Sequence, residues 1–174
     1  MVSRIRVAET ERLVLTRPQP DDAEAVFAVH GDPETNRYNP HGPMRSVEMG
    51  REWLRLWDED WATEGIGYCA VALRGDPGAV IGFAGTKVVL LEGERVLNLY
   101  YRFSPSVWGR GLAREAAQAG LDLGRPRFPE LRVVALIRPD NLPSLRLAER
   151  LGFTPSEGKL DGEGRLIHSL PQSA

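Results

Sequence analysis

The sequence predicts a mixed α/β domain built on one sheet, and two observations carry this prediction. Strand patterns separated by short turns form a hairpin series over residues 67–103, and strand and helix patterns then alternate over residues 96–151. No repeat, low-complexity tract or linker divides the 174 residues, so we expect a single domain over residues 9–170.

The N-terminal elements are expected to be one strand and two helices. Polar and apolar residues alternate over residues 11–17, which is typical of a half-buried strand. A Pro-Asp-Asp start predicts a helix over residues 20–30, and Ser46 is a suitable cap for a second helix that ends near Glu64. Three tryptophans of the second helix share one stripe, and we expect them to pack on the sheet, the alternative being that they line a substrate groove: Trp53, Trp57 and Trp61.

Glycine-rich turns at residues 75–78 and 92–94 separate the strands of the hairpin series. Apolar periodicity predicts the remaining elements in order: strands over residues 67–74, 80–91 and 96–103, a helix over 113–124, a strand over 131–137, a helix over 142–151 and a final edge strand over 164–170.

Composition and charge exclude several classes of protein. The chain is 42% hydrophobic and 26% charged, as globular domains are, and its net charge of −2 gives no general attraction for nucleic acid. No apolar run approaches the ~20 residues that span a bilayer, and residues 1–4 lack the apolar core of a signal peptide, so we expect a cytoplasmic protein that does not bind membranes. The single cysteine, Cys69, lies in an apolar run, which predicts a buried side chain and excludes a multi-cysteine metal site.

The turn at residues 108–113 (Trp-Gly-Arg-Gly-Leu-Ala) joins an apolar strand pattern to a helical one. The first turn of a helix has unpaired N–H groups that bind phosphate, and Gly109 and Gly111 let a ligand approach the backbone. Arg110 and Arg114 add positive charge. Arg114 replaces the third glycine of the dinucleotide fingerprint, and the P-loop Gly-Lys-Ser/Thr is absent here, so the turn is either a diphosphate cradle of another kind or only a tight connection.

Several further segments match one family in order and spacing over residues 9–153. They are Glu-Thr-Glu-Arg-Leu at 9–13, Asp-Pro-Glu at 32–34 with Arg-Tyr at 37–38, Ile-Gly-Phe at 81–83, Pro105 before the glycine turn, Glu-Ala-Ala at 115–117, Pro-Asp-Asn at 139–141 with Ser144, and Leu-Gly-Phe at 151–153. The chain thereby resembles the GNAT-superfamily N-acetyltransferases, closest to the ribosomal-protein-alanine (RimJ/RimL-like) type. The family's pyrophosphate signature, Gln/Arg-x-x-Gly-x-Gly/Ala, falls on residues 108–113 with tryptophan in its first position.

The resemblance implies a central, mostly antiparallel mixed sheet, flanked by helices and splayed between its fourth and fifth strands, which end at Phe103 and Ile137. Acetyl-CoA would enter the splay as co-substrate, with its pyrophosphate on the backbone of residues 110–113 and its pantetheine along the strand edge at Phe103 and Ser104. No metal is implied. The resemblance assigns these residues to the cofactor: Phe103, Ser104, Trp108, Gly109, Arg110, Gly111, Leu112, Ala113, Arg114, Asn141 and Ser144.

The acceptor side lacks the family's usual base. Many relatives have a glutamate where this chain has Asn98, which can position a water but cannot take a proton as a carboxylate does. Tyr38 and His41 would border the acceptor, and His41 is either a base or merely an exposed loop residue. We expect His30 and His168 to be structural.

The acid for the departing thiolate is also unusual. Other relatives use a tyrosine where this chain has Ala148, which leaves Ser144 as the foremost donor and Tyr101 or Tyr38 as further candidates. Asn141 and Ser144 are equally well explained as the cap of the helix that follows, and both roles are compatible.

We therefore predict an enzyme that moves acetyl from acetyl-CoA directly to a primary amine of a protein N-terminus, an amino acid or a small molecule. A non-catalytic acyl-CoA-binding or sensing protein is the alternative, and an interaction module that binds no CoA is a third class. Acidic residues at 58–60 and Glu64 would favour a cationic amine if they faced the cleft, although a solvated helix face is the simpler role. The segment after Phe153 looks short for the family, so we expect a homodimer that fills the gap.

Overall fold

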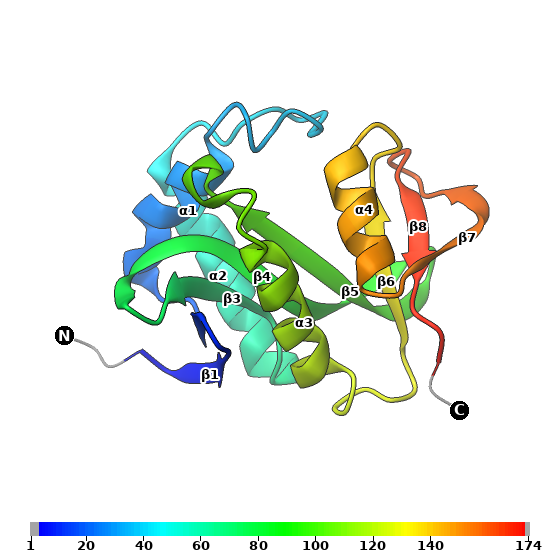
Figure 1. Cartoon of the computed structure of the whole chain (residues 1–174), viewed down its shortest axis with the longest axis horizontal. Coiled ribbons are helices and arrows are strands. Elements are labelled where there is room, and N and C mark those ends of the chain that lie inside the picture. Colours follow the sequence, from blue (N-terminus) through cyan, green and yellow to red (C-terminus); the bar gives the residue numbers. More distant parts are fainter. Residues whose placement is uncertain (1–3, 173–174) are drawn as a thin grey trace.

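The computed structural model describes residues 4–172, without the side chains of residues 157–159. One eight-stranded sheet forms the centre, in the order β1-β2-β3-β4-β5-β6-β8-β7 (Figure 1). The strands are β1 (Arg6–Glu9), β2 (Leu13–Thr16), β3 (Tyr68–Leu73), β4 (Asp76–Leu91), β5 (Glu94–Phe103), β6 (Arg132–Ile137), β7 (Thr154–Leu160) and β8 (Leu166–Ser169). The helices are α1 (Ala23–His30), α2 (Val47–Glu64), α3 (Leu112–Gly124) and α4 (Leu142–Arg150), with 3-10 turns at Pro20–Asp22 and Pro105–Val107.

Neighbouring strands are antiparallel except for β5 and β6, which run parallel. These two pair only from Val96 with Arg132 to Asn98 with Val134, and beyond that point they separate. The expected mixed, mostly antiparallel sheet with a splay between these two strands is confirmed. They are the fifth and sixth strands in the structure, because β1 precedes the first strand that the sequence predicts.

Helices cover both faces of the sheet, α3 in front and α2 behind in the view of Figure 1. Residues Leu97, Leu99 and Phe103 of β5 pack towards α3 and α4, whereas Tyr100 joins the apolar cluster of α1 and α2. Helix α3 lies close on the sheet through its small residues, because a Cβ on Gly120 would come 2.7 Å from the Cα of Gly85. The two faces of β5 therefore belong to two different halves of the core.

The C-terminal part differs from the expectation. The predicted final edge strand over residues 164–170 is wrong in its place, since β8 lies between β6 and β7 and the edge is formed by β7. The sequence of β7 (Thr-Pro-Ser-Glu-Gly-Lys-Leu) lacks apolar alternation and contains Pro155, which an edge strand tolerates. The segment after Phe153 thus completes the sheet, and this removes the stated reason for a homodimer.

Two local expectations also need correction. The turn between β3 and β4 is shorter than the predicted 75–78, because β4 already begins at Asp76. The first residues of β4 pair with Ala72 and Leu73 of β3 through two register shifts, typical of β-bulges. The tryptophan stripe divides: Trp57 is buried against the sheet, while Trp53 reaches the cleft described below.

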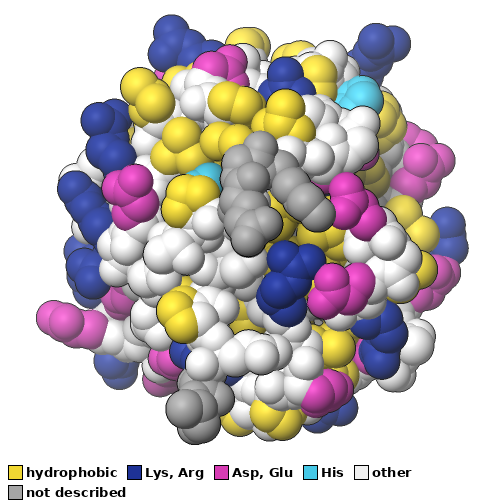
Figure 2. Space-filling view, turned by 90° about the vertical axis from the view of Figure 1, so that its right-hand side faces the viewer, with side chains coloured by type: hydrophobic (Ala, Val, Ile, Leu, Met, Phe, Trp, Pro, Cys, Tyr) yellow, Lys and Arg dark blue, Asp and Glu magenta, His cyan; other side chains and the backbone are white. Residues whose placement is uncertain are grey.

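Cys69 is buried as predicted, and burial raises the pKa of its thiol to about 12. Among residues 4–172, no helix has the length and apolarity to cross a membrane, and no cluster of three metal-ligating side chains occurs. On the face that carries β7 and β8, cationic and anionic side chains both occur, with apolar side chains scattered among them (Figure 2).

Candidate active site

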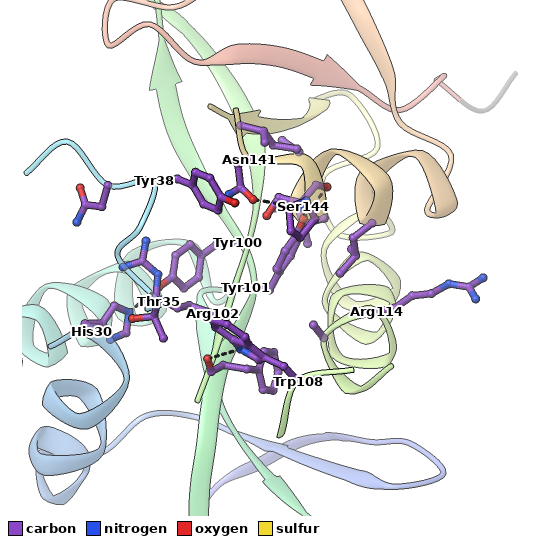
Figure 3. A pocket seen from close by; sticks show the side chains of 18 of the residues that line it. His30, Thr35, Tyr38, Tyr100, Tyr101, Arg102, Trp108, Arg114, Asn141 and Ser144 are labelled. Carbon is purple, nitrogen blue, oxygen red and sulfur yellow. Dashed lines mark hydrogen bonds between the residues drawn. The ribbon is translucent and has the colours of Figure 1, made fainter. Parts of the chain in front are cut away.

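The separation of β5 from β6 opens into a cleft of about 2100 Å³. One wall is the loop of residues 33–45, the other is α4, and the floor includes the end of β5 and the start of α3. Figure 3 shows Tyr101 and Ser144 on the α4 side of β5, and His30, Tyr100 and Arg102 on the opposite side. The cleft therefore has two halves that share one strand.

The edge of β5 presents backbone groups to the cleft. Ser104 donates its N–H to the carbonyl of Ile81 at 2.9 Å, so this residue directs its backbone to β4. Because these directions alternate along an antiparallel strand, Tyr101 and Phe103 direct theirs away from β4, into the splay. The Ser104 N–H, expected beside the pantetheine, already has this partner; the open edge lies at Tyr101 and at the N–H of Phe103.

Trp108 closes the end of this edge. Its indole Nε1 donates to the carbonyl of Phe103 at 2.9 Å, while the ring remains 49% exposed. The first residue of the glycine signature thus holds the turn against the end of β5, a role that the motif alone does not reveal.

The turn before α3 leaves a set of donors uncovered. Gly109 and Gly111 have φ of 73° and 75°, in the left-handed region that favours glycine. Gly111 is the N-cap, and no side chain caps the helix. A Cβ at Gly109 would meet no heavy atom of the described residues within 4 Å, and one at Gly111 would meet only Arg12, at 3.5 Å. The start of α3, whose residues Leu112, Ala113 and Arg114 line the cleft, therefore has N–H groups that no side chain caps.

An ionic clamp that the sequence analysis missed supports this turn. The carboxylate of Glu115 accepts hydrogen bonds from the Thr10 hydroxyl at 2.6 Å, from the Arg12 backbone at 2.8 Å and from Arg12 Nε at 2.7 Å. Arg12 also donates to the carbonyl of Arg110 at 2.8 Å. Burial alone raises the pKa of Glu115, but the hydrogen bonds from Thr10 and Arg12 and the charge of Arg12 outweigh it and lower that pKa. These residues stood among the family landmarks, yet only the fold brings positions 10, 12 and 115 together.

Of the two arginines expected at the turn, Arg114 lines the cleft, and Arg110 contributes its carbonyl to the clamp instead.

The α4 side holds the expected donor residues. Asn141 caps α4 by accepting from the Ser144 N–H at 3.2 Å, and both residues line the cleft. The Tyr101 hydroxyl donates to the carbonyl of Ser144 at 3.2 Å. Burial raises the pKa of Tyr101 to about 12, so this phenol stays protonated at neutral pH.

The opposite half contains a histidine that we expected to be only structural. His30 is 1% exposed, and its Nδ1 lies 2.9 Å from the carbonyl of Val26, which assigns the proton to Nδ1. Its Nε2 therefore accepts from the Tyr100 hydroxyl at 2.5 Å. Burial, with the nearby charge of Arg102, lowers the pKa of His30 to about 4, so the ring is neutral at pH 7. Tyr38 and His41, the residues expected at the acceptor, line this half as well.

Asn98 lies deeper than the cleft wall. It is not among the residues that line the cleft; its amide donates to the Tyr68 hydroxyl at 2.9 Å, and its buried Oδ1 has no partner within residues 4–172. Ala148 is fully buried. The acidic residues at 58–60 and 64 pair with cations outside the cleft: Asp58 with Arg17, Glu59 with Arg55, Asp60 with Lys87 and Glu64 with Arg95.

Comparison with known proteins agrees with this geometry. Residues 12–154 match the model of the acetyltransferase (GNAT) domain family. The N-acetyltransferase p20 of Bacillus licheniformis, named as uncharacterized, is 30% identical over 162 residues, which are 91% of this chain and 89% of that protein.

Solved structures share the fold over nearly the whole chain. An acetyltransferase from Agrobacterium tumefaciens matches with a TM-score of 0.81 at 25% identity, covering 99% of this chain and 98% of that one. The protein yncA of Salmonella typhimurium, solved with its cofactor acetyl-CoA, matches with a TM-score of 0.67 at 17% identity over 92% and 94% of the two chains, which shows the fold alone. With the family model covering most of its length, the chain belongs to the GNAT family of acetyltransferases.

Proposed function

We propose that residues 9–170 form a single-domain, acetyl-CoA-dependent N-acetyltransferase that moves the acetyl group directly to a primary amine. The observation that carries this proposal is the uncapped start of α3, with Gly109 and Gly111 opening space above it, beside the free edge of β5. A diphosphate fits the first feature, and an extended amide-containing chain fits the second. The family match and the acetyl-CoA bound to yncA support the same cofactor.

Bound in this way, acetyl-CoA supplies an activated thioester, and the chain's residues supply position and protons. We assign the pyrophosphate to the N–H groups of residues 110–113 together with Arg114, and the pantetheine to the backbone of Tyr101 and Phe103. The amine enters from the half that contains Tyr38 and His41. Because the cleft would hold both reactants side by side, direct transfer depends largely on their orientation.

We assign the proton transfers to side chains at the junction of β5 and α4. The Ser144 hydroxyl, which makes no hydrogen bond within the described residues, is the proposed donor to the thiolate, and Tyr101 orients the start of α4 through the Ser144 carbonyl. Asn98 cannot take a proton and lies behind the cleft lining, so its role is indirect: its Oδ1, which has no partner within residues 4–172, is suited to hold a buried water.

The test is release of CoA thiol by the purified protein across a panel of amines and short peptides, with acetyl-CoA binding measured in parallel. Gly111→Trp fills the cradle and should weaken acetyl-CoA binding by at least about tenfold. Gly93→Trp is the matched control, because Gly93 has a similar φ of 85°, nothing within 4 Å among the described residues, and a place in the β4–β5 turn. Equal binding by the two variants would contradict the cofactor placement.

A non-catalytic acyl-CoA sensor is the second candidate, and one observation favours it: Asn98 stands where many relatives have a glutamate, and it lies outside the cleft lining. Such a protein binds acetyl-CoA without releasing thiol with any amine, whereas turnover excludes it.

The RimJ/RimL-like subtype, the cytoplasmic location and the homodimer remain predictions from the sequence.

A further inference from the structure

Arg102 is a cation of the acceptor half whose position in the fold is fixed. It lies on β5, two residues beyond Tyr100, so both side chains point to the α1 side of the sheet (Figure 3). The side chain is half-buried and lines the cleft. Its Nη1 donates to Asn36 Oδ1 at 3.1 Å.

Asn36 is a rigid anchor for this guanidinium. It is 5% exposed, and its amide donates to the carbonyls of His30 at 2.6 Å and Asp32 at 2.8 Å. Asn39 donates to the same Oδ1 at 2.9 Å. Because the amide is fixed by its own donors, Oδ1 faces Arg102, and the guanidinium is held in place before any ligand arrives.

The anchor is neutral, and no counterion accompanies it. Within residues 4–172 Arg102 forms no ion pair, whereas the half-buried Arg4 and Arg165 pair with Asp22 and Asp161. The adjacent His30 is neutral at pH 7, and burial raises the pKa of Tyr100 to about 12, so this phenol is uncharged as well. A guanidinium with one neutral partner retains further N–H donors, which match a carboxylate or a phosphate.

The rest of this half has the same sign of charge. Arg37 and Arg45 line it from the loop of residues 33–45, and Glu34 is the single acidic residue of that loop in the lining. The other carboxylates of the cleft lining are engaged: Glu115 by Arg12, Asp122 by Gln118, Glu9 by Arg6 and Glu163 by Arg165. The walls around Arg102 are aromatic, with Trp53, Tyr38 and Tyr100 in the lining.

We propose, resting on the acetyltransferase function proposed above, that Arg102 binds an anionic group of the acceptor, so that the substrate is a small amine that also carries a carboxylate or a phosphate. A free amino acid with an apolar side chain has this chemistry: its carboxylate pairs with Arg102 and its side chain contacts the aromatic wall. A peptide N-terminus has an amide in place of that carboxylate, and an α-amine without an anion leaves Arg102 without an anionic partner.

The experiment measures CoA release with each of the protein amino acids and with its carboxamide. Two further substrates are 2-aminoethyl phosphate and a peptide that begins with alanine. We expect kcat/KM of the preferred acid to exceed that of its amide by roughly 10- to 100-fold, mostly through KM. Arg102→Gln should abolish this preference, so that acid and amide are used alike, and Arg102→Lys should retain part of the preference. Arg55→Gln, an exposed arginine of α2 outside the cleft, is the matched control and should keep the preference.

A second readout requires no turnover. Titration calorimetry with an N-acetylated amino acid and its amide, in the presence of CoA, should show tighter binding of the acid to the wild type and to Arg55→Gln, but not to Arg102→Gln. If no amine is acetylated, the proposed function fails, while this titration still decides the anion site. Preference for 2-aminoethyl phosphate identifies phosphate as the anion and supports the site. Three results overturn the proposal. The wild type uses acid and amide equally, it prefers the peptide, or Arg102→Gln binds acetyl-CoA more weakly than the wild type does when no acceptor is present.

Discussion

Replacement of His30 by glutamine should remove a specific part of the pH dependence of stability. In the folded protein burial first, and the charge of Arg102 second, lower the pKa of this ring from 6.5 to about 4. An unfolded chain takes up the proton near pH 6.5, and the folded protein does so only near pH 4. Between these values protons bind the unfolded state preferentially, so the free energy of unfolding falls as the pH falls.

The magnitude follows from the two pKa values. The full difference corresponds to about 3 kcal/mol, of which about 2 kcal/mol is lost between about pH 7.5 and about pH 5. Urea unfolding at both pH values measures this loss for the wild type and for His30→Gln, whose amide can still accept from the Tyr100 hydroxyl. The variant is less stable at both values, but its loss between them should be smaller by about 2 kcal/mol. An equal loss in the two proteins would refute the neutral, buried His30.

The Arg102→Gln variant provides an internal check. Burial is the larger cause of the lowered pKa of His30 and the Arg102 charge the second. Removal of that charge should therefore reduce, but not abolish, the loss of unfolding free energy between about pH 7.5 and about pH 5. Complete disappearance of this loss in Arg102→Gln would contradict the order of causes.

Three further predictions concern the cofactor half. Glu115→Gln should lower the free energy of unfolding at pH 7 by about 1–3 kcal/mol, because it weakens the clamp to Thr10 and Arg12. Urea unfolding of both proteins at a series of acidic pH values measures this difference. Since the clamp lowers the pKa of Glu115, the difference should disappear once the pH falls below that pKa. Gly120→Ala should cost about 1–3 kcal/mol or more, since its Cβ would come 2.7 Å from Gly85 Cα; thermal unfolding unchanged from the wild type would contradict the close packing of α3. Ser144→Ala should lower kcat by about 100-fold with acetyl-CoA affinity retained, and an unchanged kcat would exclude Ser144 as the proton donor.

Local patterns predicted the mixed sheet and the glycine turn after β5, and the splay between β5 and β6 was expected from the family resemblance. Alternation places each residue of β5 on one face, and a strand, a Gly-x-Gly turn and a helix in succession leave few other arrangements. Strands β1 and β7 were missed for the opposite reason: β1 has four residues, and β7 is polar with an internal proline. Their pairing is decided by neighbouring strands that are distant in sequence.

Contacts between distant segments explain what the sequence could not provide about the site. The bonds of Arg12 with Glu115, Tyr100 with His30 and Arg102 with Asn36 join residues that are 103, 70 and 66 positions apart. No spacing rule connects such pairs, so His30 was expected to be structural and Arg102 attracted no attention. Asn98 illustrates the converse, since alignment with the family's motif marked it as a site residue and the structure places it outside the cleft lining.

The two faces of β5 divide the work of the proposed reaction. Its edge and the side chains of Tyr101 and Phe103 face α3 and α4, the half assigned to the cofactor, whereas Tyr100 and Arg102 face α1 and α2, the half assigned to the acceptor. One strand thus fixes both reactants relative to each other, because adjacent residues on it must point to opposite sides. Substitutions at even and odd positions of residues 99–103 should therefore separate by kinetics: the even positions change the KM of the amine, and the odd positions change the KM of acetyl-CoA. A variant of Arg102 that altered only acetyl-CoA binding, or of Phe103 that altered only the amine, would show that the strand does not divide the site in this way.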